Sequence, residues 1–384
     1  MTSAATALPA APAVPAFPLK RIVRSGIALL LAMVLLELCA QAVKTYIIPR
    51  KWAKLDNSRM APQPLSDIDY ADTVEGRGAR LGKLSVNSLG FRGPEPTLGN
   101  ERKPGRLRVY CLGSSTTFGW GASTDGKAYP AQLEAELTTL LPGTRIEVIN
   151  AGVPGNNSEN ELQILKEDLP RLNPDIVIIW SGWPDWGHYM SQPAKKSKKN
   201  KLLANLANTY QKTGSCRVAE YIRDLVTPRP SPPSDEELDQ RKGLKTFRVD
   251  VINKFTATLT QELKLCQDSG VSPVVLGLAT PLRAEPQNLS PLARKQAANR
   301  LHAFPAASRA DLYRGILDFD KCLLQTASAT ASSRYITPED LPSDPALFID
   351  GVHMNDAGYA ALARAIAPTI RDVVYCKDAW VPCE

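Results

Sequence analysis

Histidine is scarce in this sequence, with three copies among 384 residues. The chain also has no Cys-x-x-Cys pair, and it has no cysteine and histidine at the spacing of metal ligands. These absences exclude the usual patterns of a zinc site, and we expect neither a metal nor another cofactor. A reaction that needs an imidazole can use only His188, His302 or His353.

A lipid-attachment signal is missing as well, because Leu38 rather than a small residue precedes Cys39. The N-terminal region does have a basic flank followed by an almost wholly apolar run, residues 26–43. The export machinery reads such a segment. Three interpretations are open: a cleaved signal peptide, an uncleaved anchor, or a helix buried in a cytosolic protein. We favour a transmembrane anchor over residues 26–48, because the apolar pattern continues toward the length of about 20 residues that spans a bilayer.

An anchor would make this a single-pass protein of the bacterial inner membrane, with the remaining chain in the periplasm or outside the cell. An oxidising compartment permits disulfides, and our hypothesis is that Cys376 and Cys383 form one in the tail. The net charge of +7 does not by itself indicate a nucleic-acid partner, because the lysines gather in one run, residues 195–201. We interpret that run as a solvated loop, and nucleic-acid binding is not expected.

Composition divides the chain into five parts. Residues 1–25 form a leader expected to be disordered, 26–48 the anchor, 49–105 a polar linker and extension, 106–375 the main domain and 376–384 the tail. Within the main domain, residues 188–243 and 281–345 are irregular. Since proline-rich stretches cannot hold core elements, we expect both to be insertions on the loop side of the domain.

The main domain alternates apolar strands with amphipathic helices. Strands are predicted at 107–112, 145–150, 175–180 and 274–278, and helices at 128–141, 159–172 and 356–374. Strands that are buried on both sides and separated by helices indicate a parallel sheet covered by helices on both faces. The predicted fold class is therefore α/β, a flavodoxin-like three-layer α/β/α sandwich with a central parallel sheet.

The first strand ends in a row of hydroxyls, in the sequence GSSTTFG. Ligands of open parallel sheets bind at the carboxyl ends of the strands, and a serine there becomes a nucleophile when a base takes its proton. His353 follows Asp350 by three residues, a spacing that lets the carboxylate orient the imidazole. Ser115, Asp350 and His353 therefore supply the parts of a hydrolytic triad.

Four segments together carry a resemblance to a known family. They are GSSTTFG (113–119), NAGVPGNNS (150–158), SGWPDW (181–186) and DGVH (350–353). In order and position these segments resemble the four sequence blocks of the SGNH, or GDSL-like, hydrolase superfamily. The resemblance covers about residues 106–374, and NSLGFRG (87–93) is similar to a segment found upstream of the core in many bacterial members.

The resemblance implies the SGNH hydrolase fold and a set of roles. Ser115 would be the nucleophile, with Asp350 and His353 as its partners, and the backbone N–H groups of Ser115 and Gly155 would form the oxyanion hole. The third block departs from the family pattern, because Pro184 replaces the asparagine whose amide is the third oxyanion donor. Proline offers no donor, and the loss of one such donor costs about 100- to 1,000-fold in turnover.

Several side chains near these blocks are candidates to replace the missing donor. They are Asn156, Asn157, the indole of Trp183, and His188, with Asn156 first because it adjoins Gly155. Asn156, Asn157, Trp183 and Trp186 are also candidate substrate contacts. For the two tryptophans, both core packing and contact with a sugar or acyl group remain open.

The sequence predicts a serine ester hydrolase that acts on an acylated carbohydrate, a lipid or another small ester at the cell envelope. One alternative is an envelope polysaccharide O-acyltransferase, which the anchor and the basic run would suit. A second alternative is a degenerate, non-catalytic member that binds glycan or acts as a scaffold, which Pro184 motivates.

Overall fold

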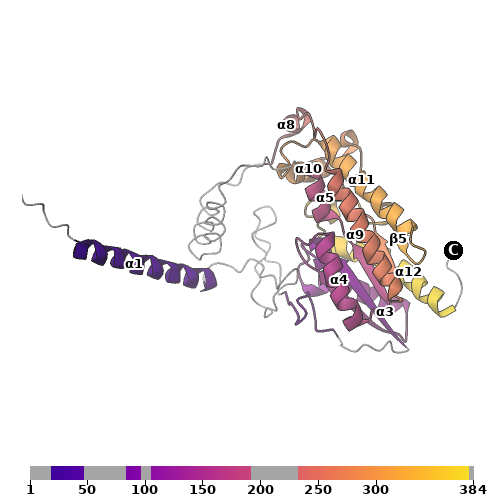
Figure 1. Ribbon diagram of the computed structural model, residues 1–384. Coiled ribbons are helices and arrows are strands. Elements are labelled where there is room, and N and C mark those ends of the chain that lie inside the picture. The colour runs from indigo at the N-terminus through magenta and orange to yellow at the C-terminus, as the bar shows by residue number, and fades with distance from the viewer. Residues whose placement is uncertain (1–18, 47–83, 97–104, 192–231, 380–384) are drawn as a thin grey trace, which may run out of the picture. The chain divides into compact units, whose positions relative to one another are not determined.

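The computed structural model describes residues 19–46, 84–96, 105–191 and 232–379 (Figure 1). The start of the predicted leader, most of the linker and the end of the tail lie outside these ranges. The lysine run lies outside them as well.

Five parallel strands form one sheet in the order β2-β1-β3-β4-β5. They are β1 (Arg106–Gly113), β2 (Arg145–Gly152), β3 (Ile176–Trp180), β4 (Ser272–Leu276) and β5 (Arg334–Ile336). The first four coincide with the predicted strands to within a few residues. Every residue of β3 is buried, as expected for a central parallel strand that is covered on both faces.

Helices cover both faces of the sheet, which confirms the predicted three layers (Figure 1). The helices α3 (Tyr129–Leu140) and α12 (Asp356–Ala379) share one apolar cluster with Val109 and Cys111 of β1. The opposite cluster contains Tyr110 and Leu112 of β1, together with α4 (Ser158–Leu172), α9 (Val249–Asp268) and α11 (Arg309–Ser328). Because successive strand residues point to opposite faces, one strand supplies both cores.

The expectation that residues 281–345 are irregular is wrong. This stretch contains α10 (Pro291–His302), α11 and the edge strand β5. Side-chain caps explain where both helices begin: Ser290 accepts a hydrogen bond from the N–H of Ala293, and Ser308 and Asp311 form a reciprocal capping box. In the described part of the other predicted insertion, α8 (Asp235–Asp239) also begins at a capping box.

The N-terminal apolar segment forms helix α1 (Leu19–Tyr46), which is not part of the compact unit that contains the sheet. Within it, Gln41 donates a hydrogen bond of 2.8 Å to Glu37. Among the described residues, no helix is long and apolar enough to cross a membrane, and the predicted transmembrane helix over 26–48 is not confirmed.

Four of the cysteines that the structure describes are free thiols: Cys39, Cys111, Cys266 and Cys322. Cys376, near the end of α12, is disulfide-bonded, and its partner lies outside the described residues. The pairing of Cys376 with Cys383 therefore stays a prediction.

Candidate active site

The hydroxyl row after β1 forms a single helical turn at the carboxyl edge of the sheet. Ser115 is the first residue of this short helix, α2 (Ser115–Phe118), and is partly exposed. The turn lies directly on Gly152 at the end of β2, where a Cβ atom would overlap the backbone nitrogen of Phe118. A glycine at this point of β2 therefore lets the turn that carries Ser115, the candidate nucleophile, approach the sheet.

Ser115, His353 and Asp350 form one chain of hydrogen bonds. The Oγ atom of Ser115 lies 2.8 Å from Nε2 of His353, although 238 residues separate them in sequence. On the other side of the ring, Nδ1 of His353 lies 2.8 Å from Oδ2 of Asp350. The other two histidines are elsewhere, His188 exposed on α5 (Trp183–Met190) and His302 at the end of α10. The structure thus brings together the three residues predicted as a triad.

The carboxylate of Asp350 is held by more than the imidazole. Its Oδ1 accepts 2.7 Å hydrogen bonds from the backbone N–H groups of Val352 and His353. Burial raises the pKa of Asp350, but the charge of His353 and these hydrogen bonds together outweigh it and hold the pKa below its ordinary value. The carboxylate is therefore charged, and it is oriented toward the ring.

The second block forms a tight turn after β2. The N–H of Asn156 donates to the carbonyl of Val153 over 3.1 Å, with Pro154 and Gly155 between them. Gly155 has φ +76°, the conformation that a glycine supplies at the third position of a type II turn. Gly155 is exposed, so its backbone is accessible beside the nucleophile turn.

The third block begins α5, and Pro184 occupies its first turn. This is a favourable place for proline in a helix, and the position offers no hydrogen-bond donor. The next residue, Asp185, accepts 2.9 Å and 3.0 Å hydrogen bonds from the N–H and the hydroxyl of Ser158. Asp185 therefore ties the third block to the end of the second.

The sequence profile of a known protein family matches the part of the chain that contains this site. The profile of the GDSL-like lipase/acylhydrolase family matches residues 111–361, which include all three triad residues. The chain belongs to this family. No curated protein sequence matches it at a significant level.

Solved structures of SGNH/GDSL acylhydrolases are similar to the chain at low identity. One is a putative acylhydrolase from Bacteroides fragilis, 13% identical, with 70% of this chain and 88% of the other covered and a TM-score of 0.37. A GDSL-like lipase from Bacteroides thetaiotaomicron is 12% identical over 72% of this chain and 92% of the other, with a TM-score of 0.38. A variant of an acetyl xylan esterase from Geobacillus stearothermophilus is 17% identical over 70% and 94%, with a TM-score of 0.40.

The candidates for the missing donor of this GDSL-like acylhydrolase have different surroundings. Asn156 is completely buried. The side chain of Asn157 caps α4 by accepting from the N–H of Asn160 at 3.1 Å, so its carbonyl oxygen already has a local role. His188 is exposed on α5.

The tryptophans of the third block lie in the core. Trp183 and Trp186 are both buried, and their rings meet edge to face at 5.7 Å. Neither indole N–H has a hydrogen-bond partner in the described part of the chain. The structure does not place either indole on an exposed wall; instead, the partly exposed Trp120 lies beside the triad, 6.2 Å from the His353 ring.

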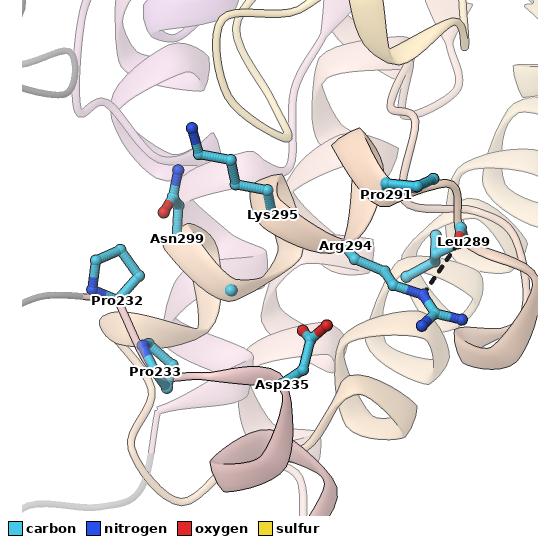
Figure 2. Close-up of a pocket in the computed structure, with 9 residues that line it drawn as sticks. Pro232, Pro233, Asp235, Leu289, Pro291, Arg294, Lys295 and Asn299 are labelled. Atoms are coloured by element: carbon cyan, nitrogen blue, oxygen red, sulfur yellow. Dashed lines mark hydrogen bonds between the residues drawn. The ribbon is translucent and has the colours of Figure 1, made fainter.

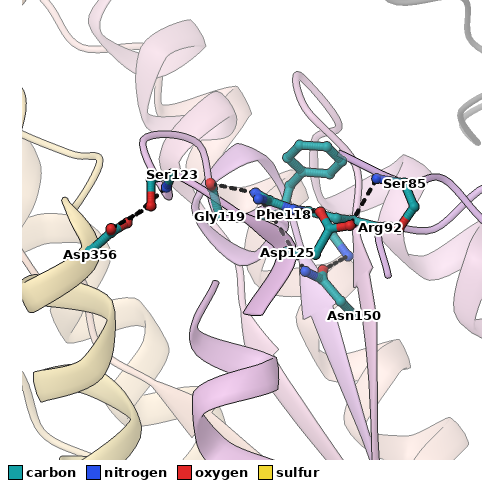
Figure 3. Close-up of polar contacts among 9 residues, drawn as sticks. Ser85, Arg92, Phe118, Gly119, Ser123, Asp125, Asn150 and Asp356 are labelled. Carbon is teal, nitrogen blue, oxygen red and sulfur yellow. Dashed lines mark hydrogen bonds and ion pairs between the residues drawn. The ribbon is translucent and has the colours of Figure 1, made fainter. Parts of the chain in front are cut away.

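Sequence reasoning missed a buried arginine beneath the nucleophile turn (Figure 3). Arg92, from the NSLGFRG segment, donates from Nη1 to the carbonyl oxygens of Phe118 at 3.1 Å and Gly119 at 2.7 Å. Its Nε forms a 2.8 Å ion pair with Asp125, which also accepts from the N–H and hydroxyl of Ser85. A cation at these carbonyls satisfies the C-terminal end of α2. In the sequence, only the NSLGFRG segment pointed to Arg92. The spacing of residues could not predict that this segment contacts the turn of Ser115.

A second set of hydrogen bonds joins the loop after α2 to α12, the helix that follows His353. Asp356, at the start of α12, accepts hydrogen bonds of 2.7 Å and 2.5 Å from the N–H and hydroxyl of Ser123 (Figure 3). The hydroxyl of Tyr359 donates to the carbonyl of Trp120 at 2.8 Å. These contacts hold the serine side and the histidine side of the site in one arrangement.

A separate pocket of about 640 Å³ lies between the start of α8 and one face of α10 (Figure 2). Lys295 and Asn299 of α10 line it, together with Pro232 and Pro233. None of the triad residues lines this pocket.

Proposed function

We propose that the chain is a serine ester hydrolase that uses Ser115, His353 and Asp350. The observation that carries the proposal is the unbroken pair of 2.8 Å contacts from Ser115 through His353 to Asp350. Membership of the acylhydrolase family supports the reaction class. The ester could be an acylated carbohydrate, a lipid or another small ester.

In the proposed reaction, Oγ of Ser115 attacks the ester carbonyl carbon while Nε2 of His353 takes the serine proton. The carbonyl oxygen gains negative charge, which the backbone N–H groups of Ser115 and Gly155 stabilise. His353 then gives the proton to the leaving alcohol oxygen, and an acyl ester remains on Ser115. A water molecule, deprotonated by His353, releases the carboxylic acid and restores the serine. Asp350 keeps Nδ1 of the ring protonated throughout.

The test is labelling by a fluorophosphonate together with hydrolysis of an aryl acetate, applied to wild type, Ser115→Ala and Ser114→Ala. Ser114 is a matched control because it is the neighbouring serine, it is buried, and its hydroxyl has no hydrogen-bond partner in the described part of the chain. We expect labelling to disappear and hydrolysis to fall at least about 1,000-fold in Ser115→Ala alone. Equal labelling of wild type and Ser115→Ala would contradict the proposal.

The two alternative functions are outcomes of the same test. Acyl transfer to an added oligosaccharide that exceeds hydrolysis would identify an O-acyltransferase. Glycan binding by a wild type that neither labels nor turns over would identify a non-catalytic member.

The proposed site of action is the cell envelope, with the N-terminal segment 26–48 attached to the membrane. Extraction of cell membranes with alkaline carbonate tests this location. Retention of the full chain in the membrane pellet would support an anchor, whereas release of the full chain would contradict it.

A further inference from the structure

Helix α10 carries Arg300 and contacts the segment that precedes Asp350. One turn before Arg300 on the same face, Gln296 donates 3.1 Å hydrogen bonds to the carbonyl oxygens of Pro345 and Phe348. These carbonyls belong to the segment that immediately precedes Asp350. Because residues four apart lie on one helix face, Arg300 lies on the same face of α10 as Gln296, one turn further along the helix.

Aromatic rings fix the guanidinium group of Arg300 in place. Its central carbon lies 4.9 Å from the ring centroid of Trp186 and 6.0 Å from that of Phe304. The rings of Trp186 and Phe304 also meet edge to face at 5.5 Å. Cation–π contacts of this kind hold the plane of a guanidinium without using its N–H donors. Arg300 therefore packs on Trp186 of the third block, one helical turn after the residue that contacts the loop of Asp350.

Arg300 differs from two other buried arginines because it has no ion pair. Its Nε is buried without a hydrogen-bond partner among the described residues, and the same is true of Nη2 of Arg92 and Nε of Arg309. Arg92 and Arg309, with side chains 1% and 9% exposed, nevertheless form ion pairs with Asp125 and with Asp235 and Asp239, whereas Arg300 forms none with a described residue. A buried donor that stays unpaired is unfavourable, because it has lost its hydrogen bond to water. An anion that bound here would remove that cost.

Asp350 places negative charge near Arg300 but does not satisfy the N–H donors of the guanidinium group. Burial lowers the pKa of Arg300, and the negative charge of Asp350 opposes this effect. The oxygens of Asp350 already accept hydrogen bonds from the His353 ring and from two backbone N–H groups. A carboxylate has about four acceptor positions, so most of those on Asp350 are occupied. Arg300 is also partly exposed, which leaves it accessible to a ligand.

We propose that Arg300 binds a carboxylate group of the substrate, so that the enzyme prefers esters whose alcohol or acyl part carries a negative charge. Guanidinium groups bind carboxylates through paired, charge-assisted hydrogen bonds. The inference rests on the proposed function, in which an ester binds at Ser115. The specificity residue comes from α10, whereas the triad comes from the loops after β1 and before α12.

Binding to the Ser115→Ala protein tests the inference without turnover. The first pair of probes is an acetylated glucuronate and the matching acetylated glucose, which places the charge on the alcohol part. The second pair is 4-nitrophenyl hydrogen succinate and its methyl ester, which places the charge on the acyl part. Calorimetry should show that the anion binds at least about ten-fold tighter than its neutral partner in one pair, and the pair identifies the source of the charge.

The arginine is then changed in the same background. Arg300→Gln should abolish the preference for the anion, and Arg300→Lys should keep part of it because the charge remains. Lys295→Gln is the matched control, because it removes one exposed positive charge of α10 that lines the separate pocket (Figure 2), and it should keep the preference. Circular dichroism checks that each variant is folded.

Equal affinity within both pairs, or no binding of any probe, would overturn the role of Arg300. A preference for the anion that survives in Arg300→Gln would overturn it as well. A clear preference that depends on Arg300, in a protein whose wild type hydrolyses no ester, would leave this inference standing and contradict the proposed function.

Discussion

Nη1 of Arg92 lies 2.7 Å from the carbonyl oxygen of Gly119, four residues after the candidate nucleophile. The same nitrogen contacts the carbonyl of Phe118, and the side chain is almost completely buried. A segment upstream of the sheet thereby supports the turn that presents Ser115. Since α2 has only four residues, this external support replaces the contacts that a longer helix would make within itself.

Arg92 should act as a positioning residue. We expect Arg92→Ala to lower kcat at least about ten-fold with little change in KM, because a displaced turn misaligns Ser115 without removing a substrate contact. Asp125→Asn separates the two roles of Arg92, because it removes the ion pair and leaves the bonds to Phe118 and Gly119. That variant should keep most of kcat. Equal loss of kcat in both variants, or a loss confined to thermal stability, would contradict a positioning role.

Pro184 should limit the rate of the enzyme. An asparagine at this point of α5 would supply an amide donor, and we expect Pro184→Asn to raise kcat toward the roughly 100- to 1,000-fold that one oxyanion donor contributes. The measurement is hydrolysis of an aryl acetate by both proteins. An unchanged or lower kcat in a folded variant would show that another group already fills the position.

Asp350→Asn should leave the loop intact while it damages catalysis. The amide oxygen can still accept from the N–H groups of Val352 and His353, but the amide nitrogen cannot accept from Nδ1 of His353. We expect kcat to fall about 10⁴-fold, because the imidazole then adopts the wrong tautomer. Since the pKa of Asp350 lies below its ordinary value, the carboxylate of wild type is charged from about pH 5 to pH 9, and the deficit should persist across that range. A deficit of less than about ten-fold would contradict the role of Asp350.

Two carboxyl groups in the core should make the stability of the domain depend on pH. Glu161 and Glu262 are completely buried, and neither oxygen of Glu262 has a hydrogen-bond partner in the described part of the chain. Burial, and then the charge of Glu161, raise the pKa of Glu262 well above its ordinary value of 4.5. A folded pKa above the unfolded one means that stability is fully present below about pH 4.5 and is lost as the pH rises toward the folded pKa.

Glu262→Gln should reduce this loss, because an amide of the same shape does not ionise. We expect the variant to exceed wild type in free energy of unfolding at about pH 8 and to differ little at about pH 5. Urea denaturation at the two pH values measures the difference. Glu159→Gln is the matched control, since Glu159 is exposed on α4, and it should not change the pH dependence. A parallel decline of wild type and Glu262→Gln would show that Glu262 is not the group responsible.

The sequence by itself determined the α/β class and four of the five strands of the described sheet, and it predicted three residues that the structure brings together, Ser115, Asp350 and His353. Runs such as residues 175–180 are local and uniformly apolar, so burial on both faces follows from composition alone. Ser115 and the pair Asp350 and His353 were recognisable because each sits in a short block whose residue types carry chemistry. Neither inference needs a contact between distant parts of the chain.

Only the tertiary structure decided which distant groups surround those blocks. The contacts of Arg92 with Gly119 and of Arg300 with Trp186 join segments that are far apart in sequence, and no periodicity records such a contact. Burial of Trp183 and Trp186 likewise depends on helices outside the third block, in a stretch that composition marked as irregular. Hydrogen bonds and ring contacts form between whatever groups the packing of the layers brings together. The family and its candidate nucleophile could therefore be predicted from the chain, whereas the contacts of Arg92 and Arg300 could not.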